Sequence, residues 1–450
     1  MIDTLIENYL FVCVAAVFGM VLIYMMFAFS DYIPHFLVAV YLTLPLFYKF
    51  TKIESLPLTT VFVIVFGPII LWQSRMMSIT NYWPVAVYSL IVIVTSAING
   101  VSMLDKISYF VPMLIALLCA MSLPARNIEK RMVSFMNLYF IWIALNAVFS
   151  ILQLFKGHEY YLISAAEGYE INQIRRGYGL VGMATQIGLQ FCLGLPLIAS
   201  FYLGGKGKKT LWKLPLFILA VVGLILTFSR GAILGVTISM ALLLWFHRKY
   251  KMLACYAVIG ALIVIFYLSL MQLLPEHYSH FFQGKDSSAA SRLPYTLVSL
   301  RMFAEHPITG FGFGGFWEHC TRYGSSVHIE AHNTYAQVLV EYGIFGFILF
   351  TSIISMSLKG YWAYIRRGSS QILKMQSVGY LCGLFAILIN ATVHCFEWNL
   401  IFWLPIMFGF MMQYIVNNEY RNALRTQRVN NCVSEEVFIP NVSQSNGLFP

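Results

Sequence analysis

Long uninterrupted runs of apolar residues constrain this chain more than any other feature. Thirteen runs are long enough to cross a bilayer as helices, which takes roughly 20 apolar residues. The second and third are short and close together, so twelve spans are an equal alternative. The runs cover residues 9–29, 33–50, 57–73, 82–99, 107–123, 132–155, 180–203, 211–228, 231–246, 252–273, 335–358, 376–396 and 398–416. The sequence therefore predicts an all-α polytopic membrane protein with about 12–13 transmembrane helices.

The composition excludes a water-soluble globular protein. Hydrophobic residues make up 59% of the chain and charged residues only 11%, whereas soluble domains carry about a quarter charged residues. The net charge of +10 fits basic loops that face an anionic leaflet. Nucleic acid is not an expected partner, because no soluble domain presents a basic face. Met1–Asn8 contains no Lys or Arg, so a cleavable signal peptide is not expected.

Clusters of Lys and Arg predict the orientation of the spans, because cytoplasmic loops are enriched in both. If the spans alternate, four basic connections fall on one side, which we assign to the cytoplasm. Their basic residues are Arg126, Lys130, Arg131, Lys206, Lys208, Lys209, Lys213, Arg248, Lys249, Lys251, Lys359, Arg366, Arg367 and Lys374. Residues 1–420 then form the transmembrane domain and residues 421–450 a cytoplasmic polar tail. The outer side holds residues 156–179 and a long loop at 274–334.

The loop at 274–334 is far longer than the usual connection between packed helices. It holds six of the ten histidines: His277, His280, His306, His319, His328 and His332. The glycine-rich run at 310–315 predicts a turn shaped by the backbone, since glycine tolerates positive φ and close approach. The run does not sit in a βαβ unit, so it is not a dinucleotide fingerprint. A loop of this length and composition indicates a functional site on the outer side.

His332 lies where this loop re-enters the membrane. A half-desolvated imidazole at the mouth of a span is suited to proton transfer near neutral pH. Asn333 and Tyr335 follow it directly, and Glu341 would lie deeper, where a carboxylate is costly unless paired. These three residues, with Arg175 and Arg176, are candidate substrate-binding residues. The alternative is that His332 is only a polar residue of the membrane interface. A zinc pair of His332 with His328, at helical spacing, is a further possibility.

Four arginines predict an anion site on the same side. Arg230 lies at a tight turn between two spans, Arg175 and Arg176 precede another span, and Arg292 lies in the long loop. The guanidinium fork matches phosphate oxygens, so converging arginines would suit a lipid diphosphate. The alternative is that Arg230 extends to the interface as many basic residues at span ends do, and that Arg175 and Arg176 lie in a solvated turn.

These motifs, in this order along the chain, resemble the O-antigen ligase and polymerase superfamily, which includes bacterial exopolysaccharide polymerases. The resemblance rests on Ser229-Arg-Gly-Ala232, Ser291-Arg292, His306-Pro-Ile-Thr-Gly-Phe-Gly312, His332-Asn-Thr-Tyr335 and Glu341-Tyr-Gly343. It implies a bundle similar to GT-C glycosyltransferases. It also implies that the protein lies in a bacterial inner membrane with its active site facing the periplasm.

The resemblance further implies a metal-independent glycosyltransferase without a cofactor. Its donor would be an oligosaccharide on undecaprenyl diphosphate, and a chain-length regulator would be a partner. His332 would act as base on the acceptor hydroxyl or orient it, Arg230 and Arg292 would neutralise the diphosphate, and Arg176 matches an arginine of the family. The physical chemistry agrees, because diphosphate is a good leaving group that needs charge stabilisation more than protonation.

Four functions remain open from the sequence. The favoured one is a polymerase that extends a surface polysaccharide (O-antigen, capsule or exopolysaccharide) from lipid-linked repeat units. A ligase that transfers the glycan to lipid A–core or protein would share its chemistry. A flippase or exporter of lipid-linked sugars and a scaffold without chemistry belong to different functional classes. The sequence also leaves open whether His394 and Glu397 line the cavity of the site or form a buried hydrogen-bonded pair. A disulfide between Cys320 and Cys395 is a further possibility.

Overall fold

The computed structural model describes residues 34–35, 38–39, 79–101, 110–125, 127–156, 177–180, 183–204, 212–273 and 292–436. Within these ranges the chain forms helices and no strands. The helices are η2 (Ile79–Tyr82), α4 (Trp83–Ile98), α6 (Val111–Ser122), η4 (Leu123–Ala125), α7 (Ile128–Lys156), α8 (Ala184–Gly204), α9 (Lys213–Leu226), α10 (Arg230–Phe246), α11 (Tyr250–Leu273), α14 (Arg292–Glu305), α15 (Gly315–His319), η9 (Cys320–Tyr323), α16 (Thr334–Arg367), α17 (Gln371–Asn390) and α18 (Leu400–Glu436). The predicted all-α class is confirmed.

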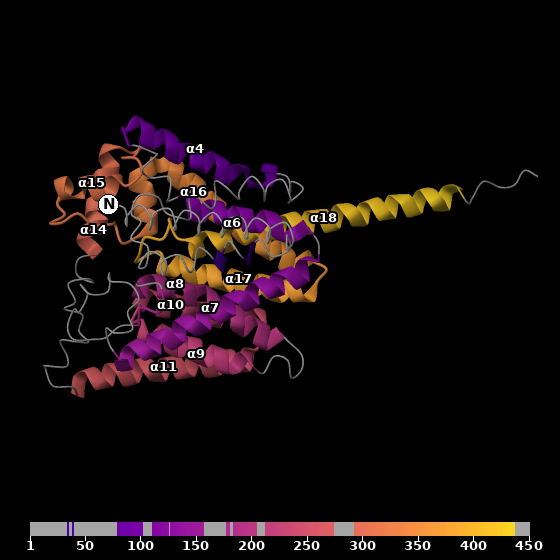
Figure 1. Ribbon diagram of the computed structural model, residues 1–450, viewed down its shortest axis with the longest axis horizontal. Coiled ribbons are helices and arrows are strands. Elements are labelled where there is room, and N and C mark those ends of the chain that lie inside the picture. The colour runs from indigo at the N-terminus through magenta and orange to yellow at the C-terminus, as the bar shows by residue number, and fades with distance from the viewer. Residues whose placement is uncertain are drawn as a thin grey trace, which may run out of the picture.

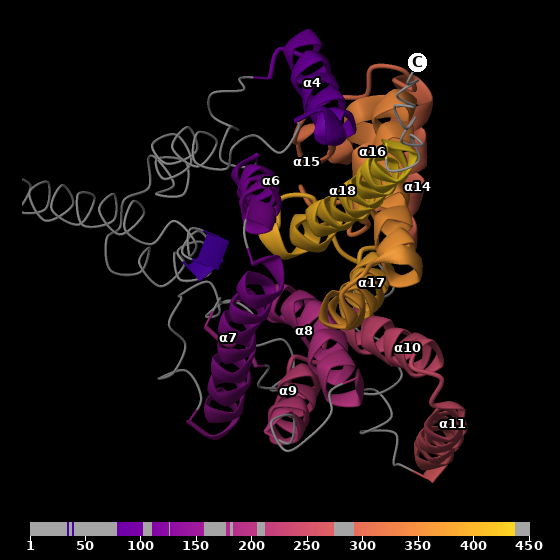
Figure 2. The ribbon, with the colours of Figure 1, turned by 90° about the vertical axis from the view of Figure 1, so that its right-hand side faces the viewer.

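The long helices run side by side as a bundle, with α14 and α15 at one end and the last turns of α18 projecting beyond the other (Figure 1). Viewed along the bundle, α8 and α17 lie at its centre, α4 lies on one side and α11 on the opposite side (Figure 2). Because α18 continues to Glu436, the first part of the polar tail at 421–450 is helical.

Ten described helices correspond to predicted membrane spans. Five are long and apolar enough to cross a bilayer (α7, α8, α16, α17 and α18), and five apolar helices are shorter (α4, α6, α9, α10 and the described part of α11). The predicted spans at 9–29 and 57–73 lie outside the described residues, as does nearly all of the span at 33–50. The protein is thus a polytopic membrane protein.

Small residues allow the central helices to approach closely, as membrane helices commonly do. Gly383 of α17 packs on Leu193 of α8, where an added Cβ would meet the leucine side chain at 2.8 Å. Gly360 of α16 packs directly on the backbone of Gly409 in α18. Peripheral helices instead expose large apolar side chains, for example Leu90 of α4 and Leu262 of α11. Such exposed apolar faces are expected where a helix contacts lipid.

The connections between the helices lie at two opposite ends of the bundle. At one end, Gly204 at the end of α8 lies beside His247 and Met375, which are close in sequence to three of the basic connections. At the other end, the start of α16 binds the connection between α17 and α18, residues 391–399. The long loop therefore emerges at the end opposite to these three basic connections, as the alternation of the spans predicts.

The long loop is largely folded where the structure describes it. It contains α14, α15 and η9, and α14 packs against α16. Val298 and Met302 of α14, Phe316 of α15 and Cys320 form a small apolar cluster with Val340 of α16. This cluster fixes the loop to the end of the bundle.

Candidate functional site

His332 lies at the junction between the long loop and α16. Its φ of 51° is in the left-handed region, which residues other than glycine rarely adopt. Asn333 caps α16, and its Oδ1 accepts hydrogen bonds from the amides of Tyr335 and Ala336 at 3.0 and 3.2 Å. The imidazole is half-buried at the mouth of the span, which is the position that the sequence predicts.

The connection at 391–399 is bound to the first residue of α16. The Thr334 hydroxyl donates to the His394 carbonyl at 2.8 Å and accepts from the Phe396 amide at 3.0 Å. The Thr334 amide also donates to the His394 carbonyl, at 3.1 Å. The rings of His394 and His332 lie 6.4 Å apart between centroids. Thr334 therefore fixes this connection beside His332.

Arg230 begins α10 at the same end of the bundle and is exposed. The next residue, Gly231, packs so tightly that an added Cβ would meet the side chains of Asn390 and Val393. Both of these residues lie at or just after the end of α17. The turn that carries Arg230 and the junction that carries His332 therefore contact neighbouring parts of one segment, residues 390–396.

Arg292 is the first residue of α14, and its side chain lies outside the described residues. Tyr295, one turn later, places its ring 5.8 Å from that of His332. The first turn of α14 thus lies beside His332. Arg175 and Arg176 fall outside the described residues, so their predicted role stays a prediction.

Two predicted substrate-binding side chains also have structural partners. The Asn333 side chain caps α16, and the Tyr335 hydroxyl donates to the Leu388 carbonyl of α17 at 3.0 Å. Tyr335 is therefore directed into the bundle by that bond.

The glycine-rich run packs against a break in α16. Gly343 interrupts the helix with φ 66° and ψ −170°. The amides of Phe311 and Gly312 donate to the carbonyls of Val340 and Glu341 at 3.0 and 2.8 Å. These bonds satisfy backbone groups that the break removes from the helix, as burial in a membrane protein requires. Gly310, Gly312 and Gly314 all have positive φ, so the predicted backbone-led turn is confirmed.

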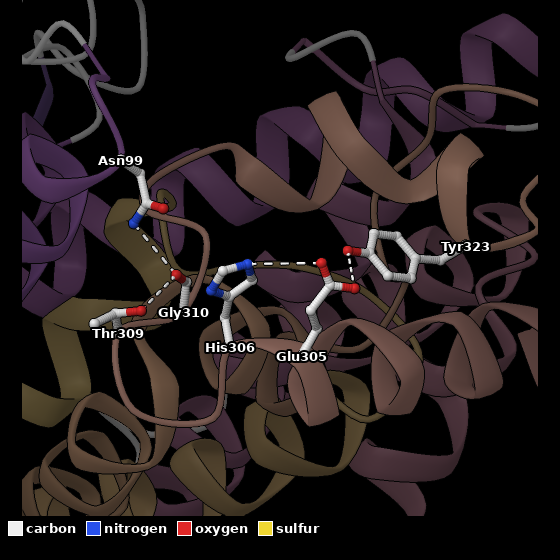
Figure 3. A network of polar contacts seen from close by, with 6 residues as sticks. All are labelled: Asn99, Glu305, His306, Thr309, Gly310 and Tyr323. Atoms are coloured by element: carbon white, nitrogen blue, oxygen red, sulfur yellow. Dashed lines mark hydrogen bonds and ion pairs between the residues drawn. The ribbon is translucent and has the colours of Figure 1, made fainter.

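The same run is tied to α4 on its other side (Figure 3). Asn99 Nδ2 donates to the Gly310 carbonyl at 3.2 Å, and the Ser96 hydroxyl accepts from the Phe313 amide at 3.0 Å. Near the outer surface, the Tyr323 hydroxyl donates to Glu305 at 2.6 Å. The glycine-rich run therefore links α4 to α16.

Two glutamates near His332, Glu341 and Glu397, are buried. Glu341 is fully buried in α16, and its Oε1 accepts from Gln337 Nε2 at 2.6 Å. Gln337 Oε1 in turn accepts from the Ala331 amide at 3.0 Å, next to His332. The predicted need for a partner at Glu341 is met on one of its two oxygens by Gln337. The backbone amides of Gly314 and Phe316 and the hydroxyl of Tyr342 also interact with this carboxylate.

Glu397 lies in the connection at 391–399 and is only 7% exposed. Neither carboxylate oxygen has a side-chain hydrogen-bond partner in the part of the chain that the structure describes, and the nearest donors are the backbone amides of Phe396 and Glu397. A hydrogen-bonded pair of His394 and Glu397, which the sequence left open, is therefore wrong. Burial raises the pKa of Glu397 well above its ordinary value, and the nearby Glu341 carboxylate raises it further.

A small pocket lies beside Glu397. Five elements contribute to it: α4, α6, α16, α18 and the glycine-rich run, together with the connection at 391–399. Its aromatic lining consists of Tyr88, Phe110, Phe313, Tyr342, Trp398 and Trp403. The sequence left open that Glu397 lines a cavity, but it did not identify the aromatic residues, because they are scattered over more than 300 positions and resemble ordinary apolar core residues.

The structure supports neither a zinc pair of His328 with His332 nor a disulfide between Cys320 and Cys395. The segment that carries the two histidines is not helical, so they do not share a helix face, and His328 Nδ1 lies 2.8 Å from the Trp317 carbonyl. The two cysteines belong to one apolar cluster but are both free thiols. Among the described residues, no three His, Cys, Asp or Glu side chains group as metal ligands.

The fold and the site together define a class: a polytopic helical membrane protein whose polar site is built where a long loop folds onto one end of the bundle. Residues 215–351 match the family model described as O-antigen ligase. This match confirms the resemblance to the O-antigen ligase and polymerase superfamily. The matched region includes Arg230, Arg292 and His332, and it begins after Arg175 and Arg176. No curated protein matches the chain in a sequence comparison.

Proposed function

We propose that this protein transfers a glycan from a lipid diphosphate to an acceptor hydroxyl, and that it polymerises repeat units of a surface polysaccharide. The supporting observation is that His332 is held at the mouth of α16, next to the first turn of α14, while the turn of Arg230 contacts the same segment, 390–396. An imidazole and two guanidinium groups are a sufficient set for this reaction.

In the proposed reaction the acceptor oxygen forms a bond to the anomeric carbon of the donor glycan. The bond between that carbon and the diphosphate oxygen breaks, and the lipid diphosphate leaves with its electron pair. His332 takes the proton from the acceptor hydroxyl. Arg230 and Arg292, with Arg175 and Arg176, stabilise the negative charge of the diphosphate. Asn333 and Glu341 position the catalytic segment.

The ligase reaction is the second candidate, because the description of the matching family is O-antigen ligase. It uses the same donor and the same bond changes, and only the acceptor differs. The proposed setting of either reaction is the periplasmic face of a bacterial inner membrane, with undecaprenyl diphosphate as the lipid and, for the polymerase, a chain-length regulator as partner.

The test is genetic complementation. The gene is deleted, restored as wild type or His332→Ala, and surface glycans and lipid-linked glycans are separated by gel. Accumulation of single repeats would indicate a polymerase, and accumulation of lipid-linked polymer would indicate a ligase. His328→Ala is the control, because this exposed histidine of the same loop contacts Trp317 instead. Full-length, surface-attached polymer from His332→Ala would overturn the proposal.

A further inference from the structure

Helix α14 of the long loop has two apolar faces. Its inner face packs Val298 and Met302 against Val340 of α16. On its outer face, Leu297 and Leu300 lie one helical turn apart and are 48% and 54% exposed. A helix that packs on a protein from the water side carries charged or polar residues opposite its buried face. The outer face of α14 is therefore unusual for a loop that lies outside the membrane spans.

One flank of the same helix is polar. Arg301 and Glu305 are exposed there, and both bind Tyr323 of η9. Arg301 Nη1 donates to the Tyr323 carbonyl at 3.1 Å, and Glu305 accepts from the Tyr323 hydroxyl (Figure 3). The apolar outer face is thus bordered by charged groups that point towards η9. This arrangement is typical of helices that lie in the interface between lipid and water.

The length of α16 locates the edge of the bilayer core. Beyond the break at Gly343, α16 exposes the apolar side chains of Phe345 and Ile348, and it ends at Arg366 and Arg367. From Phe345 to Arg366 the helix is about 32 Å long at its usual rise. This length matches the roughly 30 Å of a hydrocarbon core. Phe345 therefore marks the outer edge of the core.

Helix α14 lies just outside this edge. It packs on Val340, which precedes Phe345 by about 8 Å at the helical rise, and the headgroup layer beyond the core is about 5–7 Å thick. The exposed surface is also continuous between the two helices. Ile308 follows α14, is 62% exposed, and its carbonyl lies against Gly343. The apolar surface of α16 thus continues through Ile308 towards α14.

We propose that α14 lies in the headgroup layer of the outer leaflet and that Leu297 and Leu300 contact the acyl chains of the bilayer lipids. The consequence for the reaction rests on the proposed function, in which Arg292 binds a lipid diphosphate. Because α14 begins at Arg292, its first turn lies level with the phosphates of the membrane lipids. The donor then reaches the site sideways from the leaflet, with its prenyl chain still in the bilayer.

Fluorescence quenching on the full-length protein in phospholipid vesicles tests this contact. An environment-sensitive fluorescent amino acid replaces Leu297 or Leu300 by suppression of a stop codon. The vesicles contain phosphatidylcholine that is brominated on its acyl chains near the glycerol. Ile348 is the reference position in lipid, and Ser326, an exposed residue after η9, is the reference in water. We expect quenching at both leucine positions to be similar to that at Ile348 and at least about threefold stronger than at Ser326.

Quenching at either leucine position as weak as at Ser326 would overturn the proposal, whether water or a second copy of the chain covers this face. The measurement does not depend on glycan transfer, so the two proposals fail separately. Strong quenching together with full glycan assembly in His332→Ala would remove the transferase proposal alone. Weak quenching together with loss of assembly in His332→Ala would remove the lipid contact alone.

Discussion

The carbonyl of Val340 accepts a hydrogen bond at 3.0 Å from the amide of Phe311, a residue of the long loop. Four residues after Val340, the amide of Ile344 donates to the Pro307 carbonyl at 2.9 Å. The loop thus supplies both an acceptor and a donor to a helix that is broken at Gly343. This exchange explains how a polar loop and a membrane span form one structure next to Glu341.

The break predicts a large effect of a methyl group at position 343. Gly343→Ala would strain a residue at positive φ and would drive its Cβ into the carbonyl of Ile308. We expect a loss of roughly 2–3 kcal/mol of stability, measured as thermal unfolding in detergent by tryptophan fluorescence. Gly260→Ala is the control, since Gly260 is helical and has open space around it. An equal melting temperature for both variants would contradict this account of the break.

Thr334→Val tests the anchor between α16 and the connection at 391–399. The variant keeps the shape of the side chain but removes the bonds to the His394 carbonyl and the Phe396 amide. We expect a loss of about 1–2 kcal/mol of stability and roughly a tenfold drop in glycan transfer, because the segment beside His332 is released.

The control for this variant is Thr351→Val. The Thr351 hydroxyl bonds only to carbonyls of its own helix, so its loss should change stability by less than about 0.5 kcal/mol. If Thr334→Val loses stability but transfers glycan at the wild-type rate, the anchor serves the fold alone.

Much of this architecture could be predicted from the sequence, because bilayer spans require long apolar runs. The helices at Arg230–Phe246 and Thr334–Arg367 begin at or next to the predicted positions. The position of His332 followed from the same reasoning, since it precedes such a run directly. The basic connections likewise predicted which end of the bundle carries the loop.

Features that depend on contacts between distant residues could not be predicted. The break at Gly343 lies inside an apolar run, where a glycine is also compatible with a regular helix. The sequence also does not show that the Tyr335 hydroxyl binds the Leu388 carbonyl 53 residues away. Glu397 is buried because α4, α6 and α18 surround it, and a single sequence does not show that these helices meet there.

The proposed role of the arginines predicts that charge alone is insufficient. Arg230→Lys and Arg292→Lys keep the positive charge but lose the planar fork that binds phosphate oxygens in pairs. We expect each to lower glycan transfer by at least about tenfold, measured with the purified enzyme and a lipid-diphosphate-linked repeat unit. Arg322→Lys, at an exposed position in η9, should transfer at the wild-type rate. Full activity of both Arg230→Lys and Arg292→Lys would exclude paired hydrogen bonds from the mechanism.

The buried carboxyl of Glu397 predicts an unusual dependence of stability on pH. Its pKa in the folded protein lies well above the ordinary value of 4.5, so above about pH 4.5 the folded state holds a proton that the unfolded state releases. Stability then falls as pH rises through this window. Glu397→Gln removes the titration. Its melting temperature minus that of the wild type should therefore increase with each step from pH 4.5 upward. The exposed Glu129→Gln is the control and should follow the wild type. A constant difference between Glu397→Gln and the wild type across this pH range would show that the carboxyl has a partner in the folded protein.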